Sequence, residues 1–109
     1  MTYSEYFSSV KTRFAGTDVS DITEHLAYQF NVVGEGEGAF YVEIKEGKLF
    51  IEPYEYYDRD AMFTATIEVF NKIMDGQLDP VVAFTLQKLK VEGNFDKALK
   101  INELIQRAK

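Results

Sequence analysis

The chain has 109 residues, of which 46% are hydrophobic and 15% aromatic, with nine phenylalanines, seven tyrosines and no tryptophan. One domain over residues 1–109 is expected at that length, and the absence of cysteine excludes disulfides and thiolate chemistry. Eighteen acidic residues against twelve basic ones leave a net charge of -6, which disfavours nucleic acid as a partner because phosphate binding needs an excess of Lys and Arg.

The first element is predicted to be a helix with one strongly aromatic face. Thr2 or Ser4 can cap its start, and Gly16 marks its end. Between them, apolar residues recur at helical spacing: Tyr3, Tyr6, Phe7, Val10 and Phe14. We therefore expect this helix to bury one side against the rest of the domain.

Three strands are predicted to follow as an antiparallel meander. The first alternates with period two from Leu26 to Val32, so that every second side chain lies on one face. The acidic, glycine-rich loop 34–38 leads into a second alternating run at 40–45. After a tight turn at 46–47, Pro53 ends the third strand or places it at a sheet edge, because proline cannot donate to the ladder.

A fourth strand and a second helix are predicted after the polar, tyrosine-rich connection 54–60. The strand covers residues 61–66 and again alternates between two faces. Thr66 can cap the helix that follows, and Gly76 lies just after its end. The apolar face of this helix is formed by Ile67, Phe70, Ile73 and Met74.

The last third of the chain is predicted to form a short helix, a fifth strand and a closing helix. Asp79 can cap a helix that Pro80 starts, since a proline at the first helical position loses an amide that has no partner there. Leu89 and Val91 lie on the dry side of a strand that ends at the turn 93–94. The closing helix is predicted to run from residue 95 to 108.

Three segments carry a resemblance to a known family. They are DAMFTATIEVF (60–70), GQLDPVVAF (76–84) and KLKVEGNFDKALKI (88–101). With these segments the chain resembles a stand-alone sterol carrier protein 2 domain, the non-specific lipid-transfer family, over nearly its whole length. The family often has glycine where this chain has Gln87, and a left-handed backbone there would cost a non-glycine residue about 1 kcal/mol.

The resemblance implies an α+β fold with an apolar tunnel. A five-stranded, mostly antiparallel sheet would be covered on one side by helices, in the order helix-strand-strand-strand-strand-helix-helix-strand-helix. The tunnel between sheet and helices would hold a fatty acid, fatty acyl-CoA, phospholipid or sterol, with no catalytic residue, cofactor or metal. The lipid-binding lining implied by the resemblance is Phe63, Phe70, Ile73, Met74, Phe84, Leu89, Phe95, Leu99 and Leu104.

A tunnel of that kind has a physical consequence. A pocket of roughly 500 Å³ left empty would cost on the order of 12 kcal/mol, which rivals the stability of a whole domain. The tunnel must therefore be filled by lipid or partly collapsed by its own side chains. Burying about fourteen methylenes yields roughly 11 kcal/mol before association costs, so micromolar affinity needs few polar contacts.

Two other classes of function remain open from the residues alone. One is an interaction or homodimerisation module, because the tyrosines and phenylalanines at 3–7 and 54–57 could bury against another chain. The other is a small isomerase, in which a tyrosine and a buried Asp58 or Asp60 polarise a carbonyl. His25 is the only histidine, so a catalytic triad or histidine metal site is the weaker interpretation.

The amino end and the charge pattern bear on location. No basic stretch leads into an apolar segment after Met1, so we expect a cytoplasmic protein. At most transient membrane contact is expected, through a local basic patch formed by Lys88, Lys90, Lys97 and Lys100.

Overall fold

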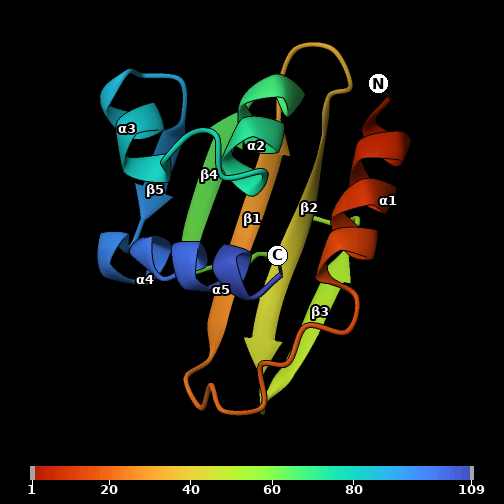
Figure 1. The fold of residues 1–109 in the computed structure, drawn as a ribbon, viewed down its shortest axis with the longest axis vertical. Helices are drawn as coiled ribbons and strands as arrows, with labels where there is room; N and C mark the ends of the chain where they lie inside the picture. The colour runs from red at the N-terminus through yellow and green to blue at the C-terminus, as the bar shows by residue number, and fades with distance from the viewer. Residues whose placement is uncertain (1, 109) are drawn as a thin grey trace.

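The computed structural model describes residues 2–108 and shows a five-stranded sheet with the helices gathered on one face (Figure 1). The strands are β1 (Leu26–Val32), β2 (Gly38–Lys45), β3 (Lys48–Glu52), β4 (Ala61–Ala65) and β5 (Lys90–Gly93). The helices are α1 (Tyr3–Phe14), α2 (Ile67–Met74), α3 (Pro80–Thr85), α4 (Phe95–Leu99) and α5 (Ile101–Arg107). The predicted α+β fold and its order of elements are confirmed.

The strands lie in the order β3-β2-β1-β4-β5. The meander β1-β2-β3 is antiparallel, and β4 pairs antiparallel with β5. Between these two parts, β1 and β4 run parallel, with Phe30 beside Phe63. The parallel pair arises because residues 53–60 carry the chain from the edge strand β3 past β2 and β1. The next strand, β4, therefore pairs with β1 on the edge of β1 that β2 leaves open.

Short polar side chains start four of the helices, three of them at caps that the sequence predicts. Thr2 forms a capping box with Glu5, and the hydroxyl of Thr66 accepts from the amide of Val69 at 3.3 Å. Asp79 accepts from the amide of Val81 at 2.7 Å. The side chain of Asn94 does the same for α4. Local chemistry therefore fixes where these helices begin.

The closing helix differs from the single element predicted for residues 95–108. The structure divides it into α4 and α5 at Lys100, whose amide donates to the carbonyl of Lys97 at 3.1 Å. This tight turn interrupts the regular helix, and the Lys100 ammonium pairs with Glu24 before β1. The closing element therefore lies where the sequence predicts it, but as two short helices and not as one continuous helix.

Gln87 ends α3 in the left-handed conformation, with φ of 61°. The amide of Gln87 donates to the carbonyl of Phe84 at 3.0 Å, and the amide of Lys88 donates to that of Ala83 at 2.9 Å. This double pattern is a Schellman motif, in which glycine is usual at the left-handed position. The chain thus keeps the left-handed turn expected of the family, although Gln87 adopts that backbone conformation less easily than glycine.

The core lies between the helices and the inner face of the sheet. Phe30 of β1 is its centre, with ring centroids 5.0 Å from Phe40, 5.2 Å from Phe63 and 5.7 Å from Phe70. Tyr6 of α1 lies 6.1 Å from Phe40. Alternation along β1, β2 and β4 therefore places Phe30, Phe40 and Phe63 toward the helices.

Candidate functional site

A small apolar cavity lies between the sheet and the helical layer. Its volume is about 30 Å³, close to the share of one water molecule in the liquid. Residues of α1, α2, α3, α5, β1, β2 and β4 line it, together with Leu89 just before β5. Its lining consists of Tyr6, Val10, Phe14, Phe30, Phe40, Val42, Phe63, Phe70, Ile73, Met74, Pro80, Leu89, Ile101 and Ile105.

Five of the nine residues expected to bind lipid line this cavity. They are Phe63 on β4, Phe70, Ile73 and Met74 on α2, and Leu89 before β5. All five are buried, with exposed fractions of at most 8%. The structure thus brings the predicted residues of α2 and β4 together around one apolar space.

The other four expected residues lie elsewhere. Phe84, Phe95 and Leu99 do not line the cavity and are exposed to 43%, 52% and 58%. Leu104 is buried, but it borders a different cleft beside Leu26. The expectation that Phe84, Phe95 and Leu99 face the sheet is not met, because these side chains of α3 and α4 face water.

Sequence reasoning missed most of the wall opposite these residues. Tyr6, Val10 and Phe14 of α1 and three strand residues, among them Phe30 and Phe40, line the cavity. The aromatic face of the first helix was the available signal, since all three α1 residues belong to it. Only the arrangement of α1 across the sheet shows that this face borders the cavity.

Among the described residues 2–108, the side chains that line the cavity carry no charge, and Tyr6 is the one of them with a side-chain oxygen or nitrogen. Burial raises the pKa of the Tyr6 phenol, so its hydroxyl stays neutral across the physiological range. A charge placed here would lack a partner and cost several kcal/mol, whereas methylene groups would gain from leaving water.

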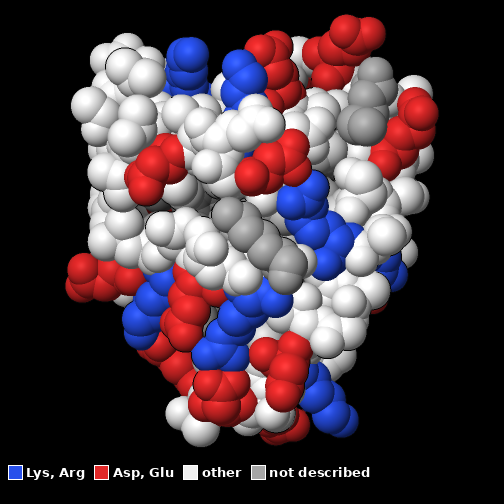
Figure 2. All heavy atoms as spheres, in the orientation of Figure 1, with Lys and Arg blue, Asp and Glu red and all other residues white. Residues whose placement is uncertain are grey.

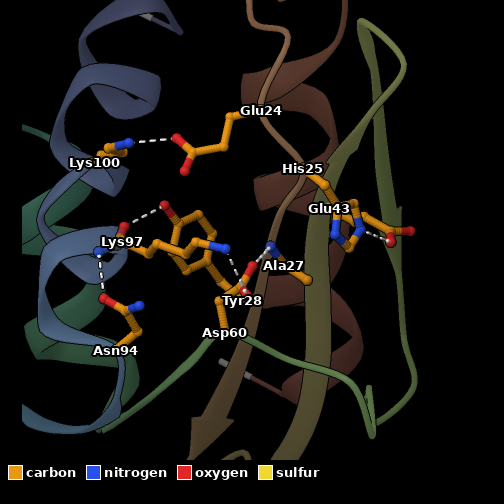
Figure 3. Close-up of polar contacts among 9 residues, drawn as sticks. All are labelled: Glu24, His25, Ala27, Tyr28, Glu43, Asp60, Asn94, Lys97 and Lys100. Carbon is orange, nitrogen blue, oxygen red and sulfur yellow. Dashed lines mark hydrogen bonds and ion pairs between the residues drawn. The ribbon is translucent and has the colours of Figure 1, made fainter.

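Asp60 is engaged in holding α4 to the sheet (Figure 3). Its carboxylate accepts from the amide of Ala27 at 2.9 Å and from the ammonium of Lys97 at 3.1 Å. The hydroxyl of Tyr28 donates to the carbonyl of Lys97 at 2.6 Å. Neither Asp58 nor Asp60 lines the cavity, so the carboxylates weighed for an isomerase lie away from the apolar space.

A second polar cluster lies on the sheet face opposite the helices. Glu43 accepts from the Tyr56 hydroxyl at 2.5 Å and lies 2.6 Å from Nε2 of His25. Burial raises the pKa of Glu43, but the hydrogen bonds from His25 and Tyr56 outweigh it and hold that pKa below its usual value. The bond to Glu43 raises the pKa of Tyr56 to about 12. This cluster fastens the loop 53–60 to the sheet.

The two aromatic groups considered for an interaction module do not form one surface. Tyr6 is buried under α1, and Tyr3 and Phe7 pack against the core beside it. Tyr56 lies with Glu43 on the far face of the sheet, where its ring is 4.9 Å from that of Tyr41. The sheet separates the two groups.

Within residues 2–108, no group of three or more His, Asp or Glu side chains is placed to hold a metal ion. Across those residues, none of the helices has the length and apolar character needed to cross a membrane.

Comparisons with known proteins fit this geometry. The model of the SCP-2 sterol transfer family matches residues 13–106. Hydroxysteroid dehydrogenase-like protein 2 of Bos taurus is 32% identical over 102 residues, which are 93% of this chain and 24% of that protein. Sterol carrier protein 2 of Arabidopsis thaliana is 30% identical over 86 residues, 73% of this chain and 70% of that protein. The chain spans about a quarter or less of the hydroxysteroid dehydrogenase-like relatives.

Solved structures share the fold. Palmitated SCP2L2 from Aedes aegypti has a TM-score of 0.69 at 21% identity, covering 96% of this chain and 95% of that one. The sterol carrier protein domain 2 of Helicoverpa armigera has a TM-score of 0.69 at 24% identity, covering 97% and 84%. A sec-alkylsulfatase from Pseudomonas has a TM-score of 0.63 at 15% identity, but this chain covers only 14% of it. The fold therefore occurs both in small carriers and inside a larger enzyme.

Proposed function

Because this chain belongs to the SCP-2 sterol transfer family, we propose that it is a non-catalytic lipid carrier. Its cargo would be a fatty acid, fatty acyl-CoA, phospholipid or sterol held between the sheet and the helices. The observation that carries this proposal is the uncharged cavity whose wall is formed by α1, α2 and the inner sheet face. The palmitated Aedes protein with the same fold supports an acyl chain as one form of cargo.

The cavity must widen to take such a cargo. Sites for small molecules have volumes of about 300–1,000 Å³, an order of magnitude above the cavity of about 30 Å³ in this structure. The closed form is inexpensive, because a cavity of this size costs on the order of 1 kcal/mol. The small volume supports the collapsed alternative, in which the chain's own side chains would fill the proposed tunnel until cargo enters.

The wall proposed to move is α3. Within residues 2–108, the hydrogen bonds of α3 are all local and join partners between residues 79 and 89. By contrast, Arg13 ties α1 to the end of α2 by donating to the carbonyl of Met74 at 2.8 Å and pairing with Asp75 at 2.5 Å. Pro80 of α3 lines the cavity. Outward movement of α3 would therefore open the space with little loss of hydrogen bonding.

The cargo would bind by its apolar part. Each buried methylene contributes about 0.8 kcal/mol, so an acyl chain can offset both association and the separation of the walls. A charged head group would remain at the rim in water, because the lining offers it no ion partner. Such a site accepts chains of different lengths, since one methylene discriminates by only about 1–3 kcal/mol.

Two substitutions of the same kind test the site. Met74 lines the cavity, whereas Met62 lies on the opposite sheet face, where its sulfur accepts from the side-chain amide of Asn31 at 3.0 Å. Fluorescent fatty acid should bind the wild-type chain with about micromolar affinity. Met74→Gln should weaken binding roughly tenfold, because it places an amide without partners against the acyl chain. Met62→Gln should change the affinity less than about twofold.

Native mass spectrometry provides an independent check. A monomer that carries a ligand-sized mass after gentle purification would support the carrier. A chain that takes up no fatty acid, or one in which Met74→Gln and Met62→Gln weaken binding equally, would contradict it.

A further inference from the structure

Large apolar side chains on α3 and α4 lie in water. Their exposed fractions range from 43% for Phe84 to 58% for Leu99, and the rings of Phe84 and Phe95 contact each other with centroids 5.7 Å apart. Figure 2 shows largely uncharged surface over α3 at the left edge of the molecule. We call this set the apolar corner: Val81, Val82, Phe84, Leu86, Phe95 and Leu99.

The orientation of α4 is the reverse of that usual for a surface helix. Lys97 and Lys100 are turned toward the sheet, where they pair with Asp60 and Glu24 (Figure 3). Phe95 and Leu99 lie four positions apart and are both more than half exposed. A surface helix ordinarily buries its apolar stripe and exposes its charges. These polar contacts hold α4 with its lysines toward the sheet, so the exposure of its apolar side follows from the fold.

Charge distinguishes this part of the chain from the rest. Between residues 79 and 100 there are four basic and three acidic residues, whereas the remainder has eight basic and fifteen acidic residues. Of the four basic residues, Lys97 and Lys100 pair with Asp60 and Glu24, and Lys90 pairs with Glu92 on the opposite sheet face, whereas Lys88 is exposed close after the corner residue Leu86. The segment that forms the corner therefore lacks the acidic excess of the remainder of the chain and repels an anionic surface less.

We propose that the apolar corner docks on the surface of a lipid bilayer. The rings of Phe84 and Phe95 and the side chain of Leu99 would enter the boundary between head groups and acyl chains, with Lys88 at the head groups. These three side chains would then contact lipid from outside the cavity.

A second copy of the chain fits the corner less well. Six side chains that are about half exposed offer on the order of 500 Å², below the roughly 800 Å² per partner of a standard protein interface. A bilayer needs no matching protein surface, so a few inserted rings suffice for reversible attachment.

The corner is also continuous with the proposed cargo site, and this step rests on the proposed carrier function. Pro80 and Leu89, at the two ends of the α3 segment, line the cavity, while the residues between them form much of the corner. Ile101, directly after α4 and Lys100, lines it as well. Docking would therefore place the movable wall of the cavity against the source of the cargo.

Cosedimentation with vesicles tests the inference. The wild-type chain should bind vesicles of phosphatidylcholine with phosphatidylserine, and more weakly those of phosphatidylcholine alone. The double variant Phe95→Gln/Leu99→Gln should lower the partition coefficient by roughly twentyfold or more, because two half-exposed side chains no longer gain from burial. The matched control Phe50→Gln/Tyr57→Gln changes two exposed rings outside the corner and should lower it less than about twofold.

A charge variant tests the role of Lys88. Lys88→Glu should weaken binding to the anionic vesicles by at least about fivefold and leave binding to phosphatidylcholine within about twofold. An unchanged thermal midpoint would show that each variant is folded.

Several outcomes would overturn the docking surface. They are a wild-type chain that sediments with neither vesicle, a control variant that loses binding as strongly as the corner variant, and a dimer without vesicles that Phe95→Gln/Leu99→Gln dissociates. Fatty acid binding is measured on the same preparations. A chain that binds fatty acid but no vesicles refutes the docking inference alone, and one that binds vesicles but no fatty acid refutes the carrier proposal alone.

Discussion

The helical layer has two halves that use the same kinds of residue differently. In α1 and α2, Tyr6 and Phe70 are exposed to 2% and 3% and pack with each other over the sheet. In α3 and α4, Phe84 and Phe95 contact each other but are exposed to 43% and 52%. Short helices normally depend on burying their apolar face, so the second half must be held in another way.

The two halves are attached by different forces. Packing around Phe30 holds α1 and α2, whereas α4 is held by the ion pair of Lys97 with Asp60 and by the bond from Tyr28 to the Lys97 carbonyl. Polar contacts can thus hold a helix on the sheet without burying its apolar face in the core. Helices α1 and α2 can then enclose a cargo, and the exposed apolar faces of α3 and α4 can contact a surface outside the chain.

The largest expected effect is a difference in the free energy of unfolding lost when a phenylalanine is removed from each half of the helical layer. Phe70→Ala should lower the free energy of unfolding by about 3–5 kcal/mol, because it leaves a cavity in a packed wall. Phe95→Ala should lower it by less than about 1 kcal/mol, since over half of that side chain is already in water. Urea denaturation of both variants measures the contrast. Equal losses would show that the two halves do not differ.

A smaller effect is expected when cargo is added. Palmitate at about a hundred times its dissociation constant should raise the free energy of unfolding by roughly 2.7 kcal/mol, because it binds only the folded chain. Hydrogen exchange should slow in α1 and α2 more than in α4. Removal of lipid from the purified protein should have the opposite effect. Slowing confined to α4 would place the cargo at the corner instead of the cavity.

The end of α3 offers a test by backbone strain. Gln87→Gly should raise the free energy of unfolding by about 0.5–1 kcal/mol, because glycine adopts the left-handed conformation without the cost borne by Gln87. The end of α2 has the same motif with Gly76 at φ of 78°, so Gly76→Gln is the matched change in reverse and should destabilise by about 1 kcal/mol. Thermal unfolding of both variants checks the pair. A destabilising Gln87→Gly would mean that the glutamine side chain contributes more than the strain costs.

The smallest effect on stability is expected from Glu43, on the sheet face opposite the helices. The pKa of Glu43 is lowered in the folded chain, so its contribution to stability is present above the usual value of 4.5 and is lost as pH falls through the folded value. Glu43→Gln should therefore flatten the fall in stability at acidic pH and leave vesicle and fatty acid binding unchanged. Denaturation at several acidic pH values measures the slope. An unchanged slope would show that Glu43 is not held ionised by His25 and Tyr56.

Local signals in the sequence predicted most of the fold, because they act over a few residues. Thr66 and Asp79 cap helices where the spacing places them, and Pro53 follows an edge strand. The break at Lys100 was missed because no glycine or proline marks it between residues 95 and 108.

The site was predictable only in part, for a physical reason. Helical spacing showed that Phe95 and Leu99 share a face, as do Phe70 and Met74. It could not show which face the sheet covers, since Lys97 and its distant partner Asp60 decide that for α4. The closed state of the cavity also depends on side-chain packing, which no pattern in the sequence reports.

The most direct test of the carrier follows the methyl signals of two methionines during a palmitate titration. Met74 lines the cavity and Met62 lies on the opposite face of the sheet. Nuclear magnetic resonance of chain labelled at the methionine methyl groups should show the Met74 signal shifting, with magnetisation transfer to the acyl chain, while the Met62 signal stays in place. Fatty acid binding that leaves Met74 unchanged, or shifts Met62 as strongly, would contradict a cargo held between the sheet and the helices.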